Sequence, residues 1–286
     1  MGLQFRGMCV SVILVCAAVV SAQPQCVRVV FDQAPKSSST AAHLLQQAQN
    51  GSSDAQFRLG LAYETGSGGQ IDDEQAAFWY RRAADAGNPA AETNLATLYS
   101  RGLGVTRNDE AALKWTLRAA AAGYAAAQSN LGTIYAEGRG VTRDDSAAIY
   151  WYSKAAAAHY APAESNLGFM YSAGRGVRAD DREAMKWYLR AASRGYTPAE
   201  INLGLAYFQS SNPRDLAAGV KWFRRAAAQG AAQAEKELGL AYERGLGVPS
   251  DLGLAMAWYG KAAAHGWKEA REDLDLLAAH NASAGR

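Results

Sequence analysis

The chain has 286 residues, of which 49% are hydrophobic and 20% are charged. Its formal net charge of +2 at pH 7 is far from the basic excess with which nucleic-acid-binding proteins hold phosphate groups. We therefore expect no nucleic-acid partner.

Residues 1–22 have the pattern of a secretory signal peptide. Arg6 supplies a positive charge, an apolar run of 13 residues extends from Met8 to Val20, and small residues at Ser21 and Ala22 allow cleavage before residue 23. We predict export to the periplasm or the medium, with no integral membrane span after cleavage. An uncleaved anchor is the alternative, although an apolar run of 13 residues is short for a bilayer.

Cleavage after Ala22 would remove Cys9 and Cys16 and leave Cys26 alone, so no internal disulfide could form. We interpret Cys26 as an incidental thiol and the protein as a monomer; a link between two chains is the alternative. Residues 23–38 lack hydrophobic periodicity and end in a Pro-Lys-Ser-Ser-Ser run, which predicts a flexible lead-in.

One unit then recurs six times. Its tryptophans are spaced by 36, 36, 36, 35 and 36 residues: Trp79, Trp115, Trp151, Trp187, Trp222 and Trp258. A leucine keeps the same step: Leu59, Leu95, Leu131, Leu167, Leu203 and Leu238. A period of this length is typical of stacked repeat proteins. We predict repeats over residues 55–90, 91–126, 127–162, 163–198, 199–233 and 234–269.

Each unit reads as two helices joined by a glycine turn. Apolar residues recur at helical spacing in both segments, and a Gly-x-Gly between them supplies the positive φ that ends a helix. An acceptor side chain follows, which predicts the N-cap of the second helix: Asp72, Asn108, Asp144, Asp180, Asp215 and Asp251. Mid-helix glycines in the first segment predict that a neighbouring helix approaches closely: Gly60, Gly132, Gly168, Gly204 and Gly239, with Ala96 in repeat two.

The array has a partial unit at each end. Residues 41–49 resemble a second helix, and residues 268–281 resemble a lone first helix with a polar outer face, as terminal caps require. We expect one solenoid over residues 39–281 with 14 helices. The pattern resembles the Sel1-like repeat family, a relative of the tetratricopeptide repeats, through stretches such as Ala127–Tyr135 and Tyr150–Ala156. The resemblance implies an all-α, right-handed α/α superhelical solenoid and an adaptor or scaffold function.

Residues for catalysis are not evident in the sequence. The four histidines have no partner at metal-ligand spacing, and no Ser-x-x-Lys or phosphate-binding glycine motif occurs. We therefore expect no enzyme activity, no metal and no cofactor. The alternative is a cell-envelope glycan-binding module, or a hydrolase like the β-lactamase-like activity attached to cysteine-rich relatives.

One cation recurs near the end of every second helix: Arg82, Arg118, Lys154, Arg190, Arg225 and Lys261. These residues, which we call the basic ladder, could bind anionic glycans. We favour a structural role, with the helix dipole and glutamates of the next helices nearby: Glu92, Glu164, Glu200 and Glu235.

The predicted partner site lies in repeats four and five. In tetratricopeptide repeats the concave face is lined by residues of the first helix that lie near its repeating leucine. At such positions this chain carries an apolar cluster: Phe169, Ile201, Leu205 and Phe208. An apolar cluster on a wet face predicts binding of a protein or peptide, whereas side chains that tuck under neighbouring units would be structural. Repeat five also replaces its glycine turn with Gln209–Arg214, so its turn should differ.

Overall fold

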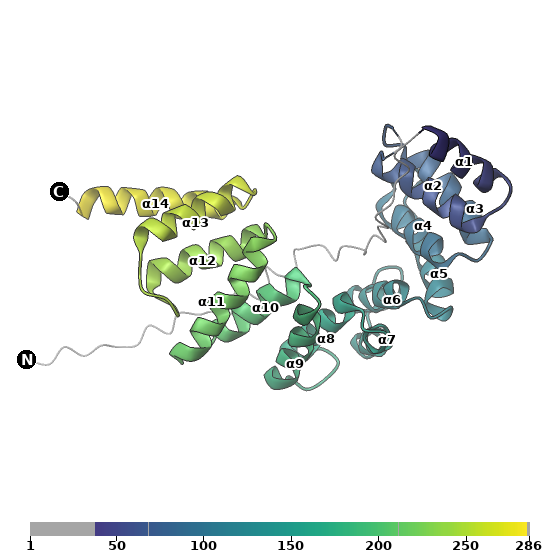
Figure 1. Ribbon diagram of the computed structural model, residues 1–286. Helices are drawn as coiled ribbons and strands as arrows, with labels where there is room; N and C mark the ends of the chain where they lie inside the picture. Colours follow the sequence, from purple (N-terminus) through teal and green to yellow (C-terminus); the bar gives the residue numbers. More distant parts are fainter. Residues whose placement is uncertain (1–37, 68, 211, 285–286) are drawn as a thin grey trace, which may run out of the picture. The chain divides into compact units, whose positions relative to one another are not determined.

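The computed structural model describes residues 38–67, 69–210 and 212–284 (Figure 1). The predicted signal peptide, most of the lead-in and Cys26 lie outside these residues. The described part contains fourteen α-helices and no strand, which confirms the all-α prediction. The helices are α1 (Ser38–Gln49), α2 (Ser53–Thr65), α3 (Asp73–Asp85), α4 (Pro89–Arg101), α5 (Asp109–Ala121), α6 (Ala125–Glu137), α7 (Asp145–Ala157), α8 (Ala161–Ala173), α9 (Asp181–Ser193), α10 (Thr197–Phe208), α11 (Pro213–Ala228), α12 (Ala232–Arg244), α13 (Leu252–Ala264) and α14 (Lys268–Ala284).

The helices form two compact units, one ending at Ala122 and the other beginning at Gly123. The first holds α1 and two helix pairs, α2–α3 (repeat one) and α4–α5 (repeat two). The second holds four pairs, α6–α7 to α12–α13 (repeats three to six), and α14. None of the described helices is long and apolar enough to cross a membrane.

The two end helices act as caps within their units. On α1, Leu44 and Ala48 are buried against Ala55 and Trp79 of repeat one. At the other end, Ala270 and Leu277 of α14 join the core formed by α13. Each cap therefore covers apolar surface that a terminal repeat would otherwise expose.

The turns between paired helices follow the predicted chemistry in five repeats. Gly66, Gly102, Gly138, Gly174 and Gly245 end the first helices in the left-handed conformation, with φ between 63° and 72°. Five predicted N-caps accept backbone hydrogen bonds at the start of the second helix: Asp72, Asn108, Asp144, Asp180 and Asp251. The capping chemistry is therefore as the sequence predicted in these repeats.

Repeat five departs from this pattern, and one predicted cap is wrong. Its first helix ends at Gln209 with φ −72°, and Asn212, rather than Asp215, caps α11. Pro213 occupies the first turn of α11, where its missing N–H costs nothing. Asp215 lies two residues after Pro213, inside the first turn, and accepts a hydrogen bond of 2.7 Å from Ser210.

The mid-helix glycines make room for an aromatic ring. A Cβ on Gly60 would lie 2.6 Å from the ring of Tyr80, and a Cβ on Gly239 would lie 2.5 Å from that of Tyr259. Repeat two has Ala96 at this position, and Thr116 replaces the ring there. The expected close approach is confirmed, and the neighbour is a side chain of the paired helix. Where the smaller Thr116 replaces the ring, the larger Ala96 replaces the glycine, so the residues at these two positions change together.

A second glycine in the turn brings neighbouring repeats together. A Cβ on Gly104 would lie 2.0 Å from the backbone oxygen of Asp73, at the start of the second helix of repeat one. Gly176 lies in the same way against Asp145, and Gly247 against Leu216. These three turns therefore pack directly on the preceding repeat, at a distance that no side chain would allow.

Candidate functional site

Each cation of the basic ladder lies over the tryptophan three residues before it. The cation-to-centroid distance is 4.5 Å for Arg190 and Trp187, and the others fall between 4.1 and 5.5 Å. Such cation–π contacts are favourable and hold the side chain along the helix. Each ladder position thus already makes a contact within its own helix.

Three of the ladder arginines, Arg118, Arg190 and Arg225, also bind buried glutamates, but in helices that differ from those we expected. Arg118 pairs with Glu92 at 2.9 Å, and Arg225 pairs with Glu200 at 2.9 Å. The glutamate comes from the first helix of the same repeat, so the expectation of a partner in the following helix was wrong. The reason is that the two helices of a repeat are antiparallel, so the C-terminal end of the second helix lies beside the N-terminal end of the first helix.

The same arginines extend to the preceding repeat. Arg118 donates to the backbone oxygen of Ala84 at 3.0 Å, and Arg225 donates to that of Ala192 at 3.3 Å. Both oxygens belong to the last turn of a helix, where carbonyls lack intrahelical partners. Burial raises the pKa of Glu92, while Arg118 acts in the opposite direction. The described contacts therefore give the ladder a structural role.

The four predicted partner-binding residues do not share one exposed surface. Ile201 is only 8% exposed and belongs to the core of repeats five and six, so it was wrongly placed on an open face. Phe208 meets the ring of Phe223 edge-on, with centroids 5.0 Å apart. A Cβ on Gly219 would lie 2.7 Å from the Phe208 ring, so Phe208 fills space within its own repeat.

Phe169 and Leu205 are half-buried and lie at one position, two residues after the repeat leucine. The Arg175 guanidinium lies 5.9 Å from the Phe169 ring centroid. The same position holds Leu240 in α12, half-buried, and Leu276 in α14, exposed. The sequence-based prediction missed these two leucines, although they continue the repeating position of Phe169 and Leu205 along the sequence. We call Phe169, Leu205, Leu240 and Leu276 the apolar row.

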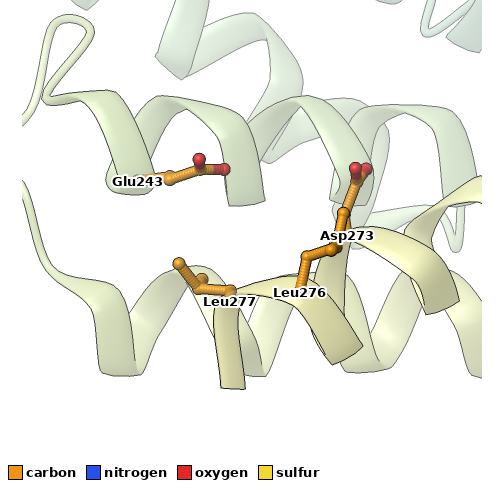
Figure 2. Close-up of a pocket in the computed structure, with 4 residues that line it drawn as sticks. All are labelled: Glu243, Asp273, Leu276 and Leu277. Atoms are coloured by element: carbon orange, nitrogen blue, oxygen red, sulfur yellow. The ribbon is translucent and has the colours of Figure 1, made fainter. Parts of the chain in front are cut away.

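The apolar row ends at an open cleft of about 450 Å³ lined by Glu243, Asp273, Leu276 and Leu277. Glu243 comes from α12 and the other three residues from α14 (Figure 2). Leu276 is 72% exposed, whereas Leu277 is buried. The hydroxyl of Tyr259, in α13, donates to Glu243 at 2.6 Å. The cleft therefore combines two carboxylates with apolar surface.

Groups for metal binding are not assembled in the described ranges. No three His, Cys, Asp or Glu side chains come together there in a way that could hold an ion. His265, which contacts Glu235 at 2.7 Å, lies at the C-terminal end of α13. Asp72 and Asp180, at the starts of second helices, serve as caps, as their place after the turn predicted.

Comparison with known proteins identifies the repeat. The family model described as Sel1 repeat matches residues 53–88, 89–124, 125–160, 161–196, 197–230 and 232–267. No curated protein matches the chain.

Among solved structures, a Sel1 repeat protein from Oxalobacter formigenes is 38% identical with a TM-score of 0.70, covering 83% of this chain and 69% of that one. A protective antigen of uropathogenic Escherichia coli, described as displaying an SLR fold, is 32% identical with a TM-score of 0.70. The match covers 83% of this chain and 51% of the antigen, so the chain spans about half its length.

An immunity protein from Pseudomonas aeruginosa is 18% identical with a TM-score of 0.50, and the match covers 86% of this chain and 85% of that one. This likeness concerns the fold alone. The six matched segments correspond to the helix pairs α2–α3 to α12–α13 and extend over most of the chain. The chain belongs to the Sel1 repeat family.

Proposed function

We propose that this protein is an exported, non-enzymatic scaffold that binds a protein or peptide segment along the apolar row. The observation that supports this most is the change of residue type at one repeating position. It holds the buried Leu61 in repeat one, Thr97 and Thr133 in repeats two and three, and then the partly exposed apolar row from α8 to α14. Partly exposed apolar side chains that recur on successive helices suit a segment with regularly spaced apolar anchors.

The residues that recur most strictly do not supply this surface. Tryptophans, ladder cations and turn glycines are engaged in contacts within and between repeats. Repeat arrays use such positions for stability and leave variable positions for partners. We therefore assign partner recognition to the variable position. Sel1 repeats generally mediate protein interaction, which agrees with this assignment.

The test is affinity capture from the native envelope or medium with the full chain, followed by mass spectrometry. We expect the double variant Phe169→Ser and Leu205→Ser to lose at least about 90% of a specifically captured protein, because hot-spot apolar anchors each carry roughly 1–3 kcal/mol of binding. Phe78→Ser is the matched control, because Phe78 is a half-exposed aromatic on α3, outside the row. Capture that is unchanged in the double variant would sink the proposal.

Export is the second part of the proposal and rests on residues 1–22. Fractionation of host cells should find a shortened chain outside the cytoplasm. A full-length chain that stays in the cytoplasm would contradict it. A glycan-binding function through the basic ladder has less support, because Arg118, Arg190 and Arg225 are paired with buried glutamates.

A further inference from the structure

A buried tyrosine in repeat one closes the space beside the first helices with a chain of polar groups. The Asn94 amide donates to the Tyr80 hydroxyl at 3.1 Å, and that hydroxyl donates to Glu64 at 2.6 Å. Tyr80 is fully buried. The amide, hydroxyl and carboxylate form a continuous chain of donors and acceptors, as buried polar groups require.

The same three positions recur beside α14 with one decisive difference. Tyr259 lies where Tyr80 lies, and it donates to Glu243, the counterpart of Glu64, at the same 2.6 Å. Asp273 replaces Asn94. An ionised carboxylate accepts hydrogen bonds and donates none, so this arrangement holds one donor, the Tyr259 hydroxyl, and two carboxylates.

The charges around this tyrosine support the same conclusion. Burial, the hydrogen bond to Glu243 and the charges of Glu243 and Asp273 all raise the pKa of Tyr259, while Arg244 lowers it. Lys236, on the same helix as Glu243, pairs with Glu237 at 3.3 Å. Among the described residues, no cation forms an ion pair with Glu243 or Asp273. The site therefore has more negative charge than its neighbours neutralise.

The cleft gives a ligand access to these carboxylates. Its volume of about 450 Å³ lies in the usual range of sites for small groups. Leu276 and Leu277 line it beside the two acids (Figure 2). A lysine or arginine side chain has the matching chemistry, because its methylene groups pack on leucine while its charged end binds carboxylates.

We propose that the cleft between α12 and α14 binds a lysine or arginine side chain of the protein partner, held by Glu243 and Asp273. This inference rests on the proposed function, because the cleft continues the apolar row through Leu276. It adds a chemical requirement, namely that the bound segment carries a basic residue beside its apolar anchors.

The test uses N-acetyl-arginine methylamide and its neutral counterpart N-acetyl-citrulline methylamide. Leucine methyl NMR spectra of the full chain report binding at Leu276 and Leu277. We expect the arginine probe to shift these methyls with at least about threefold tighter binding than the citrulline probe, because charge-assisted hydrogen bonds are roughly twice as strong as neutral ones. Asp273→Asn, which restores the residue type of Asn94 and leaves Glu243 as the only carboxylate lining the cleft, should weaken this preference.

Asp275→Asn is the matched control, because it removes one negative charge from the same helix but outside the cleft, where Asp275 pairs with Arg271. Equal shifts with both probes, no shifts, or an unchanged preference in Asp273→Asn would overturn the inference. The probe carries no apolar segment, so Phe169→Ser with Leu205→Ser should leave its shifts intact even where the proposed function fails.

Discussion

Repeats one and five close the space between their helices with different chemistry at the same positions. In repeat one the Tyr80 hydroxyl donates to Glu64, whereas in repeat five the rings of Phe223 and Phe208 meet edge-on. The apolar version needs more room, and Gly219 provides it where other repeats have alanine. The comparison teaches that the total side-chain volume is balanced over the three positions of Phe208, Gly219 and Phe223. The polar or apolar character of the contact is free to change.

The largest loss of stability should come from removing the Phe208 ring of repeat five. Phe208→Ser should lower the free energy of unfolding by about 2–4 kcal/mol, since it leaves a cavity between α10 and α11. Chemical denaturation of the purified chain measures this loss. The change would therefore also reduce partner capture indirectly, which is why it is unsuited to testing the apolar row.

Repeat four supplies the control, because it combines Ser172 with Ala184 at the positions of Phe208 and Gly219. Adding Gly219→Ala to Phe208→Ser should recover part of the lost stability by filling the cavity. Gly219→Ala alone should be destabilising, because the new Cβ would meet the Phe208 ring. A double variant less stable than Phe208→Ser alone would contradict volume balance.

The next effect concerns the close packing in repeat one. Gly60→Ala should cost about 1–3 kcal/mol, because its Cβ would lie 2.6 Å from the Tyr80 ring. Ala96→Gly is the reciprocal change in repeat two, where Thr116 takes the place of the ring. It should cost about 1 kcal/mol through helix propensity alone. Thermal unfolding compares the two, and a stabilised Gly60→Ala chain would refute the steric explanation.

A smaller difference in stability should separate variants of the ladder arginines in repeats one and five. Arg225 pairs with the fully buried Glu200, whereas repeat one has neutral Gln56 in place of that glutamate. Arg225→Met should therefore destabilise by roughly 1–2 kcal/mol more than Arg82→Met, since it leaves a buried carboxylate without its cation. We expect a smaller loss of stability than breaking a fully buried ion pair would cause, because Arg225 is half-exposed and solvent screens its charge.

Glu200→Gln tests this explanation directly. Added to Arg225→Met, it should restore most of the excess loss by making repeat five resemble repeat one. Equal losses for Arg225→Met and Arg82→Met would show that the buried charge contributes nothing.

The smallest effect should depend on pH and involves Glu237, which replaces Asn94 in the helix after repeat five. Phe223 has no hydroxyl for an amide to bind. Burial raises the pKa of Glu237 above its ordinary value of 4.5, Asp273 adds to the rise, and Lys236 and Arg244 oppose it. The folded chain then binds the proton more tightly than the unfolded chain, so stability falls as the pH rises through the raised pKa.

Glu237→Gln should therefore stabilise the protein at pH 7 by less than about 1 kcal/mol. The gain should shrink as the pH falls and vanish below 4.5, where the carboxyl is protonated in both states. Denaturation midpoints at several pH values measure it. A variant that is less stable at pH 7 would indicate that the pairing with Lys236 outweighs burial.

The periodic columns were sufficient to predict the helix pairs, the glycine turns and most caps, because each depends on local spacing. Asp215 was mistaken for a cap because the column was followed through a shortened turn, although Pro213 already marked the start of α11. Ile201 was placed on an open face by analogy, while Phe57 at the same position is just as buried. The glutamate partners and the Asp273 cleft depend on which helices pass each other, and spacing alone does not contain that information.

The turn glycines that touch the preceding repeat give the array a direction. Gly104 and Arg118 of repeat two both contact α3, and Gly247 of repeat six contacts α11. In these contacts the later repeat supplies the glycine or the arginine, and the earlier repeat supplies backbone atoms of a helix. We therefore expect such arrays to lengthen or shorten more easily at the C-terminal side, where a module carries its own means of attachment.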